Sequence, residues 1–344
     1  MKKSLKHLVA VTASVISTGA FASNLENPLY LPKANEAYVK AGAAYMYKRL
    51  DHTESLKVKG LDGKEVSPVW RFAGDLGYGI TDRLDVHGRF GYTKDTKTDR
   101  KGMHRGRIGM TLRALTEDDP IILDFYADGF LSIVNKMKGT YRRYGTQAAF
   151  DFENYSNGRV GLITGTRFGK TWNDFTLAGH VEYLQTIGNH NNQIKIDPTI
   201  PIPGYSYTMG DVLPSEISVD LKGTNEICAG FDAFYQMDSK WSFGAGFEYY
   251  QHSDNGVKGI HTQLPDVGPL AALQQGVVNT LLANTRDMKD GWDEYIIKAS
   301  VSNQVTDSVQ VSLYGEYTID DSHELSQNGT DVKAEIGVRL NAQF

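Results

Sequence analysis

The sequence predicts an all-β fold, a transmembrane antiparallel up-and-down β-barrel of about 12 strands, with 14 strands as the alternative. Three observations predict it. Segments that alternate apolar and polar residues recur from about residue 37 to the C-terminus, the connections between them are short or long in turn, and the chain begins with an export signal. Successive side chains of a strand point to opposite faces, so the alternation gives each strand one apolar and one polar face.

Residues 1–22 have the pattern of a secretory signal peptide, with Lys2, Lys3 and Lys6 before an apolar stretch and Ala20-Phe21-Ala22 as the cleavage site. Loss of these three lysines changes the formal net charge from −5 to −8. This mild net negative charge does not favour binding to nucleic acid.

Residues 23–344 are expected to form one barrel domain, because no Pro- or Ser-rich linker and no shift in composition marks a boundary. Cys228 is the single cysteine, which excludes an intramolecular disulfide framework and a cysteine metal site. The composition also contains 35 glycines and 19 tyrosines, which is unusual for a secreted globular protein.

Thirteen candidate strands begin near residues 37, 68, 84, 104, 121, 142, 158, 174, 224, 240, 291, 308 and 330. Single-chain bacterial barrels have even strand numbers, so one candidate is in excess or one is missed. Either one span between about 142 and 187 is not a separate strand, or "EISVDLKG" hides another. We favour twelve, because fourteen would place the long stretch after Ile187 on the periplasmic side, where turns are short.

The alternative fold is a β-sandwich, in which the apolar faces meet another sheet. Full charges on the polar face favour the barrel instead, because they suit a water-filled or ion-paired lumen. Candidate lumen-lining residues are Arg71, Asp75, Arg89, Arg107, Arg113, Asp124, Asp128 and Glu248. Aromatic residues near strand ends match the girdles at membrane interfaces: Tyr45, Tyr47, Trp70, Tyr78, Tyr92, Trp241, Tyr249, Tyr250 and Trp292.

The last fourteen residues, "DVKAEIGVRLNAQF", alternate almost throughout and end in Phe344. Together with the export signal and hairpins such as "YGITDRLDV", this segment resembles Gram-negative outer-membrane β-barrel proteins. The resemblance implies a location in the cell outer membrane, a lipid-facing apolar stripe, and recognition of Phe344 by the barrel-assembly machinery as an insertion signal. The hairpins are also similar to those of 12-stranded autotransporter translocators, but strands begin too early for a passenger.

The function expected from these features is porin-like passive diffusion of small polar solutes, without a cofactor, a metal or a catalytic site. One alternative is a structural or adhesive barrel with a closed lumen that displays outer loops. A barrel enzyme is a third reading, which would need His252 to approach Asp254, Asp290 or Asp293 at the mouth. Outer-membrane lipid is the expected surrounding, and the sequence leaves an oligomer open.

Helical spacing occurs in one place, within the loop near residues 255–290, where apolar residues follow at intervals of three and four. One hypothesis is that this helix folds into the barrel mouth and narrows the pore. The other is that it packs outside the pore or meets a partner. With the Pro-rich loop "DPTIPIPGYSYTMGDVLP" it would line a vestibule for a hydrophobic ligand.

Overall fold

The computed structural model describes the chain between residues 24 and 344. Its described residues leave out the segments 50–55, 58–65, 96–100, 135–136, 143–148, 155–156, 188–189, 197, 200, 203, 222, 224, 254–256, 261, 288–291 and 322–330. The expected signal peptide lies outside the described residues.

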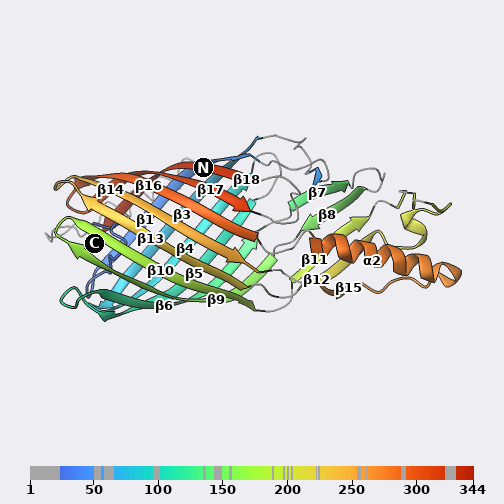
Figure 1. Cartoon of the computed structure of the whole chain (residues 1–344), viewed down its shortest axis with the longest axis horizontal. Coiled ribbons are helices and arrows are strands. Elements are labelled where there is room, and N and C mark those ends of the chain that lie inside the picture. Colours follow the sequence, from blue (N-terminus) through green and yellow to red (C-terminus); the bar gives the residue numbers. More distant parts are fainter. Residues whose placement is uncertain are drawn as a thin grey trace, which may run out of the picture.

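Twelve antiparallel strands form a closed barrel, which confirms the predicted fold class and the preferred strand number (Figure 1). The barrel closes where β1 pairs with β18, and Phe344 and Ala37 exchange two backbone hydrogen bonds at that seam. In chain order the strands are β1 (Ala37–Arg49), β3 (Val66–Thr81), β4 (Leu84–Asp95), β5 (Lys101–Leu115), β6 (Ile122–Val134), β9 (Asn157–Trp172), β10 (Phe175–Ile187), β13 (Asn225–Gln236), β14 (Trp241–His252), β16 (Trp292–Thr306), β17 (Val309–Asp321) and β18 (Asp331–Gln343).

The candidate strand near residue 142 is not part of the barrel. It falls on the hairpin of β7 (Met137–Arg142) and β8 (Ala149–Asn154), which lies between β6 and β9 in the chain. The segment "EISVDLKG" does contain a strand, β12 (Glu216–Leu221), but this strand belongs to a second sheet. The candidate strand in excess of the barrel therefore lies between residues 142 and 187, the span that the sequence analysis had indicated.

The outer face of the barrel wall is apolar and the inner face is polar, as is required of a barrel in a membrane. Outward positions carry exposed large apolar side chains, whereas the buried polar side chains lie at inward positions. Pairs of aromatic rings lie on the outward face near both rims, with Tyr45 against Trp70 at 5.2 Å and Trp172 against Phe175 at 6.4 Å between ring centroids. Within the described part of the chain, no helix is both long and apolar enough to cross a membrane.

The aromatic prediction is correct for most of its members. Tyr45, Trp70, Tyr78, Tyr92 and Trp241 are exposed on the outward face. Tyr250 instead points inward, where its hydroxyl donates to Glu248. The side chains of Tyr47 and Trp292 lie outside the described residues.

A charged residue on the outward face tests whether that face contacts lipid. Leu313, exposed near the middle of β17, is expected to tolerate alanine, whereas Leu313→Arg should lower the folding free energy by about 2–4 kcal/mol, because a guanidinium must then enter hydrocarbon. The measurement is guanidinium unfolding in lipid vesicles, followed by heat-modifiable electrophoresis. Equal stability of the two variants would contradict a lipid-facing position.

Tight turns join the strands at the end that holds the C-terminus (Figure 1). In the turn between β13 and β14, the backbone N–H groups of Lys240 and Trp241 both donate to Asp238 at 2.7 Å. These two hydrogen bonds hold the pKa of the Asp238 carboxyl below its usual range. The aspartate therefore stays ionised and fixes the turn that sets the register of the hairpin.

A second sheet of six strands extends from the opposite end of the barrel (Figure 1). Its order is β15–β12–β11–β8–β7–β2, where β2 is Leu56–Lys57, β11 is His190–Ile196 and β15 is Val257–Ile260. The helix α2 (Ala271–Asp287), preceded by the 3-10 turn η2 (Gly268–Leu270), packs over this sheet together with the loop that carries the 3-10 turn η1 (Met209–Asp211).

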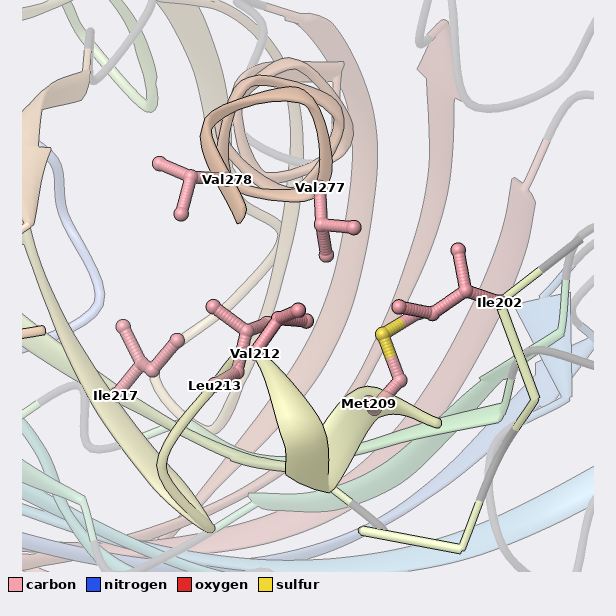
Figure 2. Close-up of a cluster of buried hydrophobic side chains, with 7 residues drawn as sticks. All are labelled: Ile202, Met209, Val212, Leu213, Ile217, Val277 and Val278. Carbon is pink, nitrogen blue, oxygen red and sulfur yellow. The ribbon is translucent and has the colours of Figure 1, made fainter. Parts of the chain in front are cut away.

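The hypothesis that the helix narrows the pore is wrong. Figure 1 shows α2 beyond the end of the barrel, and Figure 2 shows Val277 and Val278 on the side of the helix that meets Val212 and Leu213. The apolar residues of the helix and of the Pro-rich loop bury each other, because neither segment can leave its apolar side in water. This cluster consists of Ile202, Met209, Val212, Leu213, Ile217, Val277 and Val278.

Candidate functional site

The inner wall of β5, β6, β9 and β10 holds a buried network of ion pairs. Asp124 is fully buried on β6 and accepts hydrogen bonds from Arg113 at 2.8 Å and Arg167 at 3.0 Å. Arg107 on β5 makes two parallel bonds of 2.9 Å to Glu182 on β10. Each of these residues occupies an inward position of its strand, so the alternation of the sequence brings them to one side of the lumen.

His87 extends the same network. One ring nitrogen lies 3.1 Å from Asp128 on β6 and the other 3.4 Å from Asp85 on its own strand. Asp128 also lies 3.9 Å from Arg107. Because these side chains are buried and paired with each other, this half of the wall is filled by protein and not by water.

The adjoining wall, formed by β18, β1, β3 and the part of β4 around Arg89, carries ion pairs that reach solvent. Arg89 donates to Asp75 at 3.0 Å, and Arg71 donates to Glu335 at 2.7 Å. The side chain of Arg89 is 58% exposed although it points into the barrel. The lumen therefore has open space beside this part of the wall.

Residues 24–36, termed here the N-terminal plug, cross the lumen near the end that holds the C-terminus. Asn24 donates to Gln236 and Ser242, on β13 and β14, and Asn27 donates to Thr176 on β10. At the other end of the plug, Asn35 and Gly79 of β3 are joined by a backbone hydrogen bond of 2.8 Å. The plug thus contacts strands on opposite sides of the barrel.

Glu26 joins the plug to β17 and β18 through an ion pair and two further hydrogen bonds. It accepts bonds from Arg339 at 3.1 and 3.2 Å, from Asn341 at 2.7 Å and from Ser312 at 3.1 Å. Lys40 donates to the backbone carbonyl of Leu25, the residue before it. A carboxylate with this many donors is held firmly within the lumen.

The buried network also holds the plug. Arg113 donates to the carbonyl of Leu29, and Arg167 donates to the carbonyl of Tyr30. The Leu29 side chain packs against Ile122 of β6. The position of the plug therefore depends on the same arginines that Asp124 holds.

All eight residues predicted to line the lumen occupy inward positions. They fall into two groups that the sequence did not separate. The buried network contains Arg107, Arg113, Asp124 and Asp128, and the water-exposed wall contains Arg71, Asp75 and Arg89. Glu248, on β14, is buried beside Lys298 and His180.

Sequence reasoning missed the plug, including Glu26. Its residues show no period of two or of 3.6, so no regular pattern marked them. The ion-pair partners Glu182, Arg167, Glu335, Lys298 and Arg339 were missed for a different reason. They lie on alternating strands like the predicted residues, but pairing across the lumen depends on the stagger of the barrel.

The arrangement required for a barrel enzyme is not found among the described residues. His252 lies 2.9 Å from Glu226 and 3.5 Å from Glu294, both on neighbouring strands. Asp293 accepts from the hydroxyl of Tyr249, and Asp254 and Asp290 lie outside the described residues. In the described part of the chain, no cluster of histidine, cysteine or acidic side chains has the geometry of a metal site.

No protein-family model and no curated protein matches this chain. Among solved structures it is similar to an outer membrane channel from Pseudomonas putida F1, with 12% identity and a TM-score of 0.48 over 96% of this chain and 100% of that one. It is also similar to the Pseudomonas putida toluene transporter TodX, with 10% identity and a TM-score of 0.42 over 95% of each chain. A third similar structure is the translocator domain of the autotransporter NalP from Neisseria meningitidis. It has 10% identity and a TM-score of 0.46 over 100% of this chain and 95% of that one.

These TM-scores all lie below 0.5, so the class of this protein rests on its own geometry. A closed twelve-stranded barrel with an apolar outer belt, aromatic residues at both rims and a polar interior is an outer-membrane β-barrel. The protein resides in the outer membrane, because only lipid covers such a belt without exposing it to water.

Proposed function

We propose that the protein is an outer-membrane channel for small polar solutes that the N-terminal plug holds closed. The observation that carries this proposal is the exposure of Arg89, a charged side chain on the inner face that water reaches. Ala73, its neighbour on the same wall, is also exposed toward the lumen. A barrel of twelve strands is wider than the eight-stranded barrels that side chains fill, so it has room for a narrow aqueous path.

The plug is held by hydrogen bonds, an ion pair and buried apolar side chains, among them Leu25 and Leu29. Water can replace the hydrogen bonds at a small net cost for each, whereas the apolar side chains must be exposed or repacked when the plug moves. The expectation of passive diffusion through a lumen narrowed by the outer loop near residues 255–290 is therefore modified. Diffusion through the lumen requires that residues 24–36 move away from the wall or rearrange.

Removing residues 24–30 is expected to convert a mostly silent barrel into one with steady, discrete conductance steps. The deletion removes the contacts of Asn24, Glu26, Asn27 and Leu29 but leaves the backbone pairing of Asn35 intact. The measurement is single-channel recording of the refolded protein in a planar bilayer. The matched control is the double substitution of Gln275 and Asn279 by alanine on the exposed side of α2, which should leave conductance unchanged.

A second candidate function is display of the outer sheet by a permanently closed barrel. The observation that favours it is the buried network of Asp124, Arg107 and Glu182, which fills one side of the lumen. The same recording separates the two functions. A deletion variant that is folded by electrophoresis but remains silent would exclude the channel and leave the display role.

A further inference from the structure

Small residues form a hollow in the water-exposed wall. Gly42 of β1 pairs with Ala73 of β3 on one side and with Arg339 of β18 on the other, and Ala73 pairs with Gly91 of β4. A Cβ placed on Gly42 would approach nothing closer than 3.4 Å. The floor of this hollow, Gly42, Ala73 and Gly91, therefore presents at most one methyl group at each position, and Ala73 is exposed toward the lumen, while the Cβ and Cγ of Arg339 lie 3.8 Å from the place that a Gly42 Cβ would take.

Cations surround this floor in the adjoining rows of the sheet. In the row toward the plug, Lys40 pairs with Asp75, and Asp75 pairs with Arg89. In the row toward the outer sheet, Ala44 pairs with Arg71. Arg339 stands in the row of the floor itself, stacked at 4.8 Å over the ring of Tyr314.

The arginine side chains on this wall are more exposed than the side chains of their acid partners. The exposed fractions are 58% for Arg89 against 24% for Asp75, and 35% for Arg71 against 5% for Glu335. Arg89 uses only its Nε for Asp75, and Arg71 uses only Nη1 for Glu335. Within the described part of the chain, the other N–H groups of Arg89 and Arg71 have no acceptor, and an arginine carries five donors in a fixed fork.

Glu26 of the plug already shows what this wall binds. Its carboxylate is held by Arg339, Asn341 and Ser312, at the edge of the hollow nearest the plug. Two oxygens accept from one guanidinium, an amide and a hydroxyl, which is the donor set that proteins use for carboxylates and phosphates. This is an observation of an oxyanion on the site, independent of the exposure of the arginines.

We infer that the hollow is a binding site for the oxyanion group, carboxylate or phosphate, of a small solute, and that the solute competes there with Glu26. Arg89, Arg71 and Arg339 supply the donors, and the small residues of the floor leave the space. The inference rests on the proposed channel function, because it assigns a solute class to the same lumen. Asp75, Asp232 and Glu316 also face this lumen and offset the positive charge, so the preference comes from hydrogen-bond donors at short range and not from a long-range field.

The first experiment measures binding to the refolded full chain in detergent by calorimetry. The probes are succinate, inorganic phosphate and the neutral isostere succinamide. Succinate is expected to bind and succinamide is not. The Glu26→Gln variant, in which the competing carboxylate is removed, should bind succinate about ten-fold more tightly, since about 1.4 kcal/mol corresponds to that factor. If phosphate binds but succinate does not, the site binds an oxyanion, but the conclusion that it takes a carboxylate is wrong.

Two variants test the site itself. Arg89→Gln should weaken succinate binding about ten-fold or more, because it removes the exposed fork. Ala73→Asp adds a carboxylate to the exposed floor without removing any ion pair, and should abolish binding even if Arg89→Gln folds poorly. The matched control is Arg83→Gln, which removes an exposed arginine in the turn between β3 and β4. Equal binding by Ala73→Asp and the parent chain would overturn the inference.

Failure of this inference and failure of the channel give different results. If the chain lacking residues 24–30 conducts but neither probe binds the full chain, the channel stands and the oxyanion site is wrong. If succinate binds with the expected dependence on Arg89 but the deleted chain stays silent, the site stands as a binding site of a closed barrel.

Discussion

Asp124→Asn is expected to reduce the free energy of unfolding by about 3–5 kcal/mol, because it leaves Arg113 and Arg167 as unpaired charges in a buried site. Asp124 is fully buried and accepts from both guanidinium groups. The measurement is urea unfolding in lipid vesicles. Since the same arginines hold the carbonyls of Leu29 and Tyr30, the variant should also conduct more often than the parent chain.

The control for Asp124 is Asp75→Asn. Its partner Arg89 is water-exposed, so this substitution is expected to cost less than about 1 kcal/mol. Equal losses from the two substitutions would show that burial does not separate the two walls, and the division into a buried network and an aqueous wall would be wrong.

Glu26→Ala is expected to raise the ratio of open to closed channel roughly 30- to 150-fold, because it removes hydrogen bonds to a charged group worth about 2–3 kcal/mol in total. The open probability in a planar bilayer measures this ratio. Since the ion pair with Arg339 contributes, the effect should shrink as the salt concentration rises.

Glu117→Gln is the control for Glu26, because it removes an exposed carboxylate from the turn between β5 and β6. It should leave the open probability unchanged. The open probability of Glu26→Ala could stay unchanged while the chain lacking residues 24–30 conducts. Closure would then depend on other contacts of the plug, such as those of Asn27 and Leu29.

The sequence pattern predicted the helix α2 but not the surface against which it packs. Its helical spacing identified the helix, but spacing describes one face of one element and not the surface that the face meets. Val277 and Val278 bury against Val212 and Leu213, which lie more than 60 residues earlier in the chain. Either destination, the pore or the outer sheet, would satisfy the same periodicity.

The sequence by itself determined the barrel strands and their inward and outward faces, and it limited their number to twelve or fourteen, with twelve favoured. The faces follow from an alternation of period two that is readable along the chain, and the limit follows from the even strand count of bacterial barrels. The inward position of all eight predicted lumen residues is a result of that alternation.

Only the tertiary structure decided which charges pair and what closes the lumen. Arg107 meets Glu182 across 75 residues because the stagger of the closed barrel brings β5 and β10 to the same height. Glu26 reaches Arg339 although its segment has no periodic pattern at all. Local alternation sets the face on which a side chain lies, whereas its partner is set by the relative shift of strands, which is a property of the whole barrel.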